Sequence, residues 1–427
     1  MNNIGARGLL MVFNDNNSKH TLNSNKSVQQ VSVDYDSDWR SNLSNLEVPI
    51  SVEKDPLLVK ALSLTIEGRR ITKDMGAKLF READSQGLSS LANLIKVSRF
   101  GNYVFFNENL HVNITNVCTL ACRFCAFRRG SRHIDAYSLS PEEFVSRIKP
   151  FSHIIDEVHA VGGLHPEWTV SHYSDIYQLT KQRYPNISIK SLTAVEVKHL
   201  ASRSGLSISD TLSLLHEAGL DSLPGGGAEI LVDSVRDRIC RGKEKSSEYL
   251  EIHHEAHMLG IPTNCTMLFG TVETIEDMMT HLDKLRKQQD NSSGFQCFVP
   301  YPFLKDNTRL PEARLSTANE ILRVISISRI MLDNIPHLKA YRMNIGDHLA
   351  EIAIHSGADD IDGTVGHEEI MHEAGSTTSV DYDAKRMQKL VKSTGLVPVK
   401  RNSTYNSFVI LDEQIKSEKM KLPIAGQ

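Results

Sequence analysis

Short apolar runs alternate with longer amphipathic segments through the middle of the chain, from about residue 104 to residue 375. A strand followed by a helix, repeated about eight times over roughly 260 residues, is the rhythm of a (β/α)8 TIM-type barrel. A doubly wound sheet has the same alternation, so it remains an alternative. We expect strands at 110–115, 157–161, 187–192, 222–223, 263–269, 294–299, 338–343 and 359–362, and helices at 141–148, 173–183, 208–218, 249–259, 275–288, 317–332 and 348–355.

The flanking segments have different patterns. Residues 1–50 begin with a stretch rich in Asn, Ser and Asp that offers little apolar surface to bury, which predicts a disordered extension. Residues 51–103 repeat Leu and Ala at helical spacing and predict a helical cap in front of the barrel at 104–375. Residues 376–427 form a closing segment whose one regular signal is a helix at 382–392.

Composition narrows the class of protein. Hydrophobic residues make up 40% of the 427 residues and charged residues 23%, which is ordinary for a globular protein. A formal charge of −4 gives no electrostatic reason to expect nucleic acid as a partner. No apolar run approaches the ~20 residues of a membrane span. We therefore expect a cytoplasmic protein with no membrane insertion and no nucleic-acid partner.

In a barrel of this kind, functional residues lie at the carboxyl ends of the strands and in the loops that follow them. The unusual residues of this chain occur there. Cys118 follows the first expected strand, and a Gly-Gly pair follows the second. Glu196 follows the third strand, a run of three glycines with Glu229 follows the fourth, and Gly270 with Glu273 follows the fifth.

The cysteines are unevenly distributed. Cys118, Cys122 and Cys125 fall within eight residues, whereas Cys240, Cys265 and Cys297 are scattered and are expected to be small buried apolar residues. Three thiolates on one loop would leave one iron of a four-iron cluster with an open position. A zinc ion could instead take the trio together with His111 or His133, although zinc motifs usually contain a second cysteine pair, and none is present.

The pattern Cys-x-x-x-Cys-x-x-Cys, with Phe124 before its last cysteine and the first strand of a βα barrel before it, resembles the radical S-adenosylmethionine (SAM) superfamily. The resemblance implies a [4Fe-4S] cluster held by Cys118, Cys122 and Cys125, with SAM chelated to the fourth iron. It also implies reductive cleavage of SAM to methionine and a 5′-deoxyadenosyl radical. A one-electron donor such as flavodoxin or ferredoxin would be the partner.

Segments 113–118 and 122–127 resemble the branch of the superfamily that makes deazaflavin and menaquinone precursors. Within that branch, segments 161–168, 223–230 and 360–365 most resemble the aminofutalosine synthase family of the futalosine route to menaquinone. The resemblance implies addition of the 5′-deoxyadenosyl radical to 3-[(1-carboxyvinyl)oxy]benzoate, giving 6-amino-6-deoxyfutalosine and bicarbonate. A deazaflavin synthase subunit that acts on tyrosine, and a dehypoxanthine futalosine cyclase, are alternatives within the same branch. A zinc-stabilised binding protein is the alternative of another class.

The resemblance also assigns roles to individual residues. Phe124 would lie beside the adenine of SAM, and Glu196 and Glu229 would hold a ribose or amino group, unless they serve as ordinary charges at helix starts. For the substrate, whose two carboxylates need a cationic or donating partner, the candidates are His165, Lys339 and Arg342, with His159 also considered. Cys240, Cys265 and Cys297 should lie away from the radical. The remaining implied SAM contacts are Gly162, Gly163, Gly270 and Glu273.

Overall fold

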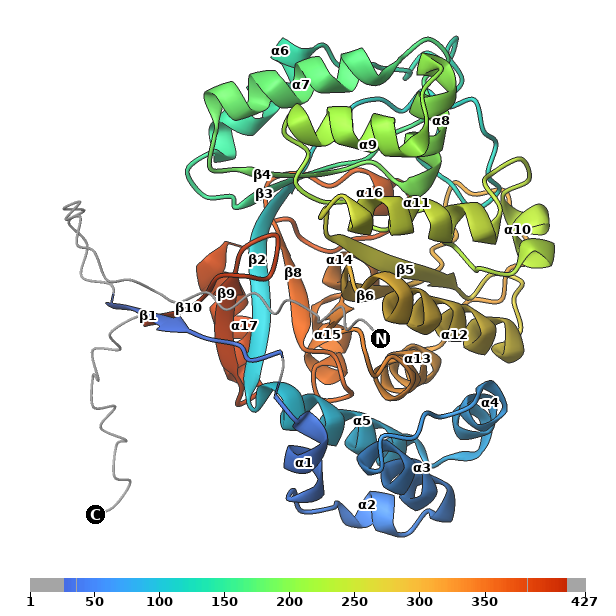
Figure 1. The fold of residues 1–427 in the computed structure, drawn as a ribbon, viewed down its shortest axis with the longest axis vertical. Helices are drawn as coiled ribbons and strands as arrows, with labels where there is room; N and C mark the ends of the chain where they lie inside the picture. Colours follow the sequence, from blue (N-terminus) through green and yellow to red (C-terminus); the bar gives the residue numbers. More distant parts are fainter. Residues whose placement is uncertain (1–26, 36, 382, 413–427) are drawn as a thin grey trace, which may run out of the picture.

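The computed structural model describes residues 27–35, 37–381 and 383–412, and its centre is a parallel barrel (Figure 1). Each strand pairs in parallel with the next, and the last strand pairs with the first. The short fourth strand consists of two residues: Ser222 forms a β-bridge with Lys190 of the third barrel strand, and Leu223 forms one with Thr263 of the fifth. The (β/α)8 prediction is confirmed. The strands are β2 (Tyr103–His111), β3 (Glu157–Ala160), β4 (Ser188–Ser191), β5 (Thr263–Phe269), β6 (Phe295–Pro302), β7 (His337–Ala340) and β8 (Asp360–Thr364).

Helices surround the barrel where the apolar spacing predicted them. The 141–148 helix has its predicted bounds, and Ser140 and Glu143 cap each other's backbone at its start. The sequence pattern missed several shorter helices after strands. The observed set is α6 (Pro141–Ile148), α7 (Val170–Arg183), α8 (Ala194–Ser204), α9 (Ile208–Glu217), α10 (Asp233–Ile239), α11 (Ser246–Met258), α12 (Ile275–Ser292), α13 (Ala318–Met331), α14 (Arg342–Ile345), α15 (Asp347–Ala353) and α16 (Ile370–Glu373), with a 3-10 turn at Lys149–Phe151.

Four helices form the N-terminal cap at the lower end of the molecule in Figure 1, against α12 and α13. The guanidinium of Arg323 on α13 fixes this contact, because it donates to the backbone carbonyls of Leu79, Phe80 and Ala83 at 2.7–3.0 Å. These bonds satisfy carbonyls that the end of a helix leaves without partners. The helices are α2 (Ile50–Glu53), α3 (Pro56–Ile66), α4 (Lys73–Glu82) and α5 (Ser85–Phe100).

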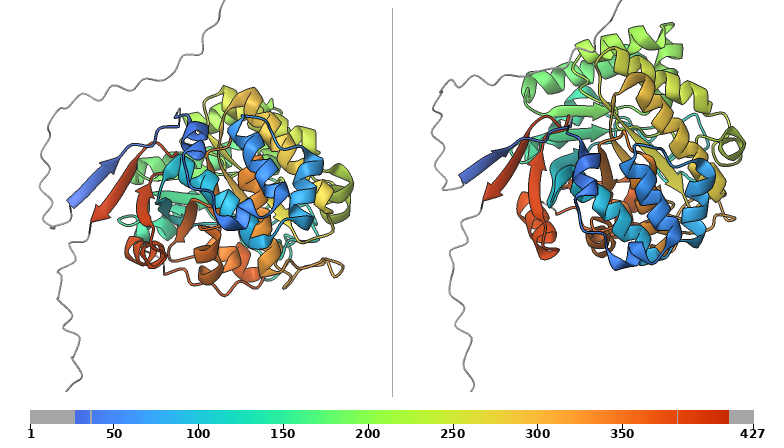
Figure 2. Two further views of the ribbon diagram at one scale, coloured as in Figure 1. Left: turned by 90° about the horizontal axis from the view of Figure 1, so that it is seen from below. Right: turned by 60° about the horizontal axis from the view of Figure 1, so that its bottom comes forward.

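The two flanking segments are more ordered than their composition predicts. Residues 27–50 contain β1 (Ser27–Val31) and α1 (Trp39–Ser44), so the prediction of disorder is wrong for them; residues 1–26 lie outside the described residues. β1 pairs with β10 (Phe408–Asp412), β10 with β9 (Val397–Arg401), and β9 with β2. Figure 2 shows β1 and β10 projecting from the barrel wall. The closing helix is α17 (Ala384–Ser393); Tyr382, where it was expected to begin, is outside the described residues.

Two expected strands end three or more residues before their predicted ends. The first was expected at 110–115 but β2 ends at His111, because residues 112–117 leave the sheet to form the loop that carries the cysteines. The seventh was expected at 338–343, but β7 ends at Ala340 and Arg342 begins α14. In the part of the chain that the structure describes, no helix has the length and apolar character needed to cross a membrane.

Candidate active site

The three-cysteine loop lies at the carboxyl end of β2 and is held mainly by backbone hydrogen bonds. Cys118 N–H donates to the carbonyl of Arg129 at 3.0 Å, and Thr119 N–H donates to the carbonyl of Leu164 at 3.0 Å. Thr115 Oγ1 donates to the carbonyl of Tyr137 at 2.7 Å. The loop is therefore anchored both to its own return segment and to the loop after β3.

The Gly162-Gly163 pair after β3 packs directly against this loop. Gly163 N–H donates to the carbonyl of Thr115 at 2.7 Å. A Cβ at Gly163 would lie 2.2 Å from the carbonyl oxygen of Val117, and one at Gly162 would lie 2.9 Å from that of Thr115. Glycine is needed here because two backbone segments approach closely. The pair thus positions Cys118, a role that is compatible with contact to SAM.

We expect Gly163→Ala to displace the Cys118 loop and to reduce both iron content and SAM cleavage at least tenfold. The added methyl group cannot be accommodated without moving the backbone at Val117, and overpacking of this kind costs about 1–3 kcal/mol. Iron per chain and the rate of methionine formation would measure the effect. Gly130→Ala is the matched control, because a Cβ there meets no atom within 4 Å. Equal iron content in the two variants would contradict this explanation.

The thiols themselves fit an iron–sulfur cluster. Burial raises the pKa of Cys122 to about 12 and also raises the pKa of Cys125, so binding of metal must supply the charge that stabilises the thiolates. Over the described residues, no three His, Cys, Asp or Glu side chains converge in the arrangement that a single metal ion would require. A four-iron cluster places each thiolate on a different iron, so its ligands stand farther apart.

A cavity of about 210 Å³ opens beside the cysteine loop, inside the carboxyl end of the barrel. It is lined by Cys125 and by two of the residues expected to contact SAM, Phe124 and Glu229. None of Cys240, Cys265 and Cys297 is among the described residues that line it, as the need to exclude thiols from the radical path predicted. The rest of the lining comes from loops and strand ends and includes His111, His159, Thr193, Gly226, Gly227, Tyr301, Tyr341 and Glu368.

The two candidate carboxylates occupy different positions. Glu229 lines the cavity and pairs with Lys243 Nζ at 2.5 Å. Glu196 is buried beneath it, where it accepts hydrogen bonds from Gly162 N–H at 2.9 Å and from Thr193 N–H at 2.7 Å. Burial raises the pKa of Glu196 to about 7. Glu196 therefore links the Gly-Gly loop to the start of α8 and belongs to the support of the site.

Gly270 and Glu273 lie apart from this cavity. The Glu273 carboxylate accepts from Gly270 N–H at 2.5 Å and from Thr271 N–H at 3.0 Å, just before α12 begins. Both residues line a separate hollow together with Arg238 and Glu312. Glu273 therefore stabilises its own loop in this structure, and its expected contact with adenine stays a prediction.

None of the three residues proposed as substrate contacts lines the cavity. His165 stacks on Trp168 with ring centroids 4.5 Å apart. Lys339 is paired with Asp360 at 2.6 Å. Arg342 lies on α14 instead of a strand, and its guanidinium bonds to Asp347 at 2.8 Å. The seventh-strand carboxylate clamp is therefore not formed.

His111 on β2 and His159 on β3 line the cavity instead, as partners in the parallel pairing of the two strands, and their rings are stacked with centroids 4.5 Å apart. We call this pair of histidines the cavity floor. Burial lowers the pKa of His111 well below its usual range and lowers that of His159 to about 4. His159 was considered from the sequence as a substrate contact, but His111 was considered only as a zinc ligand. Strand alternation places each ring on one face of its strand, but the register that brings the two together is seen only in the structure.

Below the histidines, the barrel interior holds a layer of ion pairs made by Glu157, Lys190, Lys339, Asp360 and Arg401. Lys190 bonds to Glu157 at 2.7 Å, and Arg401 from β9 bonds to Asp360 at 2.5 and 3.0 Å. Burial alone would raise the pKa of Glu157, but Lys190 and His159 hold it at about 2. These five residues carry three positive and two negative charges, and the buried carboxylate of Asp362, which Lys339 also faces, brings a third negative charge.

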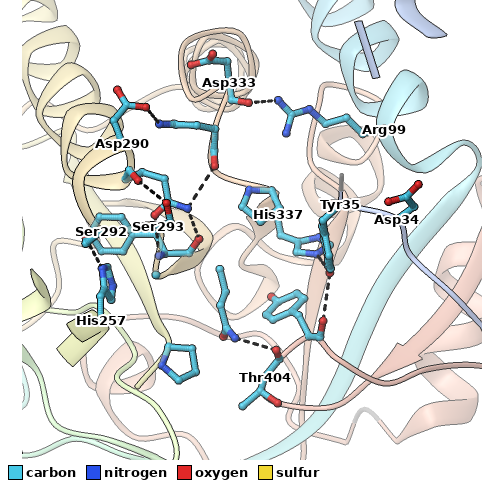
Figure 3. A pocket seen from close by; sticks show the side chains of 18 of the residues that line it. Asp34, Tyr35, Arg99, His257, Asp290, Ser292, Ser293, Asp333, His337 and Thr404 are labelled. Carbon is cyan, nitrogen blue, oxygen red and sulfur yellow. Dashed lines mark hydrogen bonds between the residues drawn. The ribbon is translucent and has the colours of Figure 1, made fainter. Parts of the chain in front are cut away.

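A larger hollow of about 800 Å³ lies at the opposite, amino-terminal ends of β6 and β7 (Figure 3). Its polar groups largely bond to one another. Arg99 donates to the carbonyl of Asp333 at 2.5 Å, His257 bonds to Ser292 at 2.6 Å, and Tyr35 bonds to His337 at 2.7 Å. Residues of the barrel and of both flanking segments meet in this hollow. It is not the candidate active site, because catalytic residues of such barrels lie at the other end.

Comparison with known proteins agrees with this geometry. Residues 112–285 match the radical SAM superfamily and residues 292–414 match the CofH/MqnC C-terminal region. The chain is 35% identical to an aminodeoxyfutalosine synthase of Thermus thermophilus over 84% of this chain and 98% of that one. It is also 35% identical to a 5-amino-6-(D-ribitylamino)uracil–L-tyrosine 4-hydroxyphenyl transferase of Methanoculleus marisnigri, over 82% and 97%.

A solved structure of methylornithine synthase superimposes with a TM-score of 0.64 over 79% of this chain and 96% of that one, at 19% identity, and so supports the fold. The sequence matches span the cysteine loop, the barrel and the C-terminal strands that close it. The chain therefore belongs to the radical SAM superfamily, in the family of aminodeoxyfutalosine synthase and its relatives.

Proposed function

We propose that the protein is a cytoplasmic aminodeoxyfutalosine synthase of menaquinone biosynthesis, which uses SAM as a co-substrate and 3-[(1-carboxyvinyl)oxy]benzoate as the acceptor. The observation that carries the proposal is the three-cysteine loop beside a cavity lined by Gly226 and Gly227, in a chain similar to such a synthase over nearly the whole length of that relative. The run Gly225-Gly226-Gly227 favours this family, because the related deazaflavin synthase subunit typically lacks the third glycine.

The cofactors are assigned to the residues that the fold gathers at the carboxyl end of the barrel. Cys118, Cys122 and Cys125 would hold a [4Fe-4S] cluster, and Phe124 and Glu229 would contact SAM across the cavity. When bound, cluster and SAM supply the 5′-deoxyadenosyl radical. The protein's own part is to exclude water and stray hydrogen donors and to orient the enolpyruvyl double bond.

Gly162, Gly163 and Glu196 would belong to the SAM site by fixing the backbone beside Cys118 through the bonds described above. We also assign Gly270 and Glu273 to the contact with SAM; in this structure they line a neighbouring hollow.

An acidic one-electron donor such as flavodoxin or ferredoxin is the partner we propose. The side chains of Arg132, Arg238 and Arg241 are exposed in the cysteine loop and in the α10 region that bonds to it through Arg123. Exposed basic residues of this kind steer an acidic protein toward the cluster. Reduction by flavodoxin should slow as the salt concentration rises, because such steering is screened.

The substrate decides between this function and tyrosine chemistry. Anaerobic protein with dithionite and SAM would be given either the enolpyruvyl benzoate or tyrosine with 5-amino-6-(D-ribitylamino)uracil. We expect consumption of the first and formation of a product with the mass of 6-amino-6-deoxyfutalosine. Consumption of tyrosine instead would overturn the proposal and favour the second candidate, which the 35% identity to the tyrosine transferase supports.

A further inference from the structure

We propose that His111 and His159, above the layer of buried ion pairs, form the anchor for the benzoate carboxylate of the substrate. This inference rests on the proposed function and names the part of the substrate that the cavity floor recognises. It replaces the seventh-strand clamp, whose residues are committed to internal ion pairs.

The first observation is a buried donor without a partner. His111 is 4% exposed, lines the cavity, and its Nε2 atom has no hydrogen-bond partner. Leaving such an atom without a hydrogen bond costs about 1–3 kcal/mol of free energy, so we expect an atom of the ligand to bond to it. The neighbouring His159 ring, stacked at 4.5 Å, brings a second imidazole to the same part of the floor.

The second observation is the charge around the pair. Because burial lowers the pKa of both rings, they are neutral near pH 7 and contribute N–H donors without charge. The cations that act on the rings are Lys190 and Lys339 of the ion-pair layer below, where Lys190 faces Glu157 and Lys339 faces Asp360. Arg342 lies 3.9 Å from Asp362 but is already paired with Asp347 at 2.8 Å, so the cations and carboxylates of this region balance.

The other charged groups of the cavity do not suit an anion. No Lys or Arg is among the described residues that line it. Glu229 is neutralised by Lys243, and the Glu368 carboxylate accepts from the backbone N–H groups of Met371 and His372 at 2.9 and 3.1 Å. The histidine floor is thus the place in the cavity that offers ring nitrogens to a carboxylate, with the cations Lys190 and Lys339 in the layer below.

The position of the reacting double bond determines which of the two substrate carboxylates binds the histidines. The reacting double bond must lie near SAM, at the cysteine-loop end that Phe124 and Cys125 line. The pyruvyl carboxylate is attached to that double bond, whereas the benzoate carboxylate extends away from it across the ring. Only the latter reaches the strand residues of the floor while the double bond stays beside the loop.

The test compares two acceptors, the enolpyruvyl benzoate and its analogue 2-phenoxyacrylate, which lacks the ring carboxylate. The wild type should prefer the full substrate in kcat/KM. His111→Phe, which keeps an aromatic ring but has no donor, should reduce that preference about 10- to 100-fold, the value of one or two hydrogen bonds to a charged group. The change should appear mainly in KM. His111→Gln, which restores an N–H donor, should recover part of the preference.

Methionine formation without acceptor is measured in every variant, so that the acceptor preference is compared at a known rate of SAM cleavage. His153→Asn, at an exposed histidine, is the matched control. If His111→Phe does not fold, His159→Gln and His159→Phe test the same pair. An unchanged preference in folded variants overturns the inference alone. A wild-type enzyme that leaves the enolpyruvyl benzoate unconsumed overturns the proposed function, and the inference with it.

Discussion

Replacing Cys122 by alanine should abolish the reductive cleavage of SAM while leaving the barrel folded. Removing one of three thiolates leaves too few ligands to retain a four-iron cluster with one open iron. The loop is held by backbone bonds at Cys118 and Thr119, which the substitution does not touch. Anaerobically purified wild type should be brown, with about four iron and four sulfide per chain. The variant should be nearly colourless and form no methionine, and its far-UV circular dichroism should be unchanged.

Cys240→Ala is the matched control for this experiment. Cys240 is also a buried cysteine. Its thiol acts electrostatically on the thiol of Cys122, so the two lie near each other, but Cys240 does not line the cavity. The control should keep the iron content and the rate of SAM cleavage. A Cys122→Ala protein that still binds four irons, or a Cys240→Ala protein that loses them, would show that the cluster is held by other residues.

Arg401→Met should destabilise the protein by about 3–5 kcal/mol, the usual cost of breaking a buried ion pair from one side. Arg401 is 2% exposed and makes two bonds to Asp360, with its guanidinium 3.8 Å from the ring centroid of Tyr405. The free energy of unfolding in urea would measure the loss. Arg69→Met is the control: its pair with Glu67 is well exposed, so the change should stay below about 1 kcal/mol.

The pH dependence of this effect has a definite sign. Burial alone would raise the pKa of Asp360, but Arg401 and Lys339 hold it far below its usual range. The stability from the pair is therefore complete above the unfolded-state pKa, about 3.9, and is lost as the pH falls further. The difference between wild type and Arg401→Met should shrink below about pH 4. Adding Asp360→Asn to Arg401→Met should recover part of the lost stability at pH 7. An Arg401→Met protein as stable as the wild type would contradict the described packing.

Much of the barrel could be predicted from the sequence because its elements are encoded locally. β5 has its predicted bounds at 263–269, and α6 has its predicted bounds and cap. The cysteine loop was predictable for the same reason, since its spacing is contained in eight residues. The order of residues 27–50 was not, because β1 pairs with β10, nearly the whole chain length away, and composition gives no sign of such a partner.

The floor of the site shows a second limit. Whether His111 meets His159 depends on the register between β2 and β3, which is fixed by hydrogen bonds between strands that are separated by a long loop and a helix. The placement of Arg342 failed for a related reason: its N–H donates to Asp362 at 2.6 Å, where β7 has ended and α14 begins. Both features are tertiary, so the spacing of residues along the chain does not reveal them.

The central claim is that the adenosyl part of SAM is incorporated into the product, and labelled SAM tests it most directly. The enzyme would be reduced anaerobically and given SAM with ¹³C throughout its ribose, together with unlabelled 3-[(1-carboxyvinyl)oxy]benzoate, and the products separated and weighed by mass spectrometry. We predict that all five ribose carbons appear in the product, with one methionine and one bicarbonate formed per turnover. Release of the label as free 5′-deoxyadenosine, with an unlabelled product derived from the benzoate, would contradict this account.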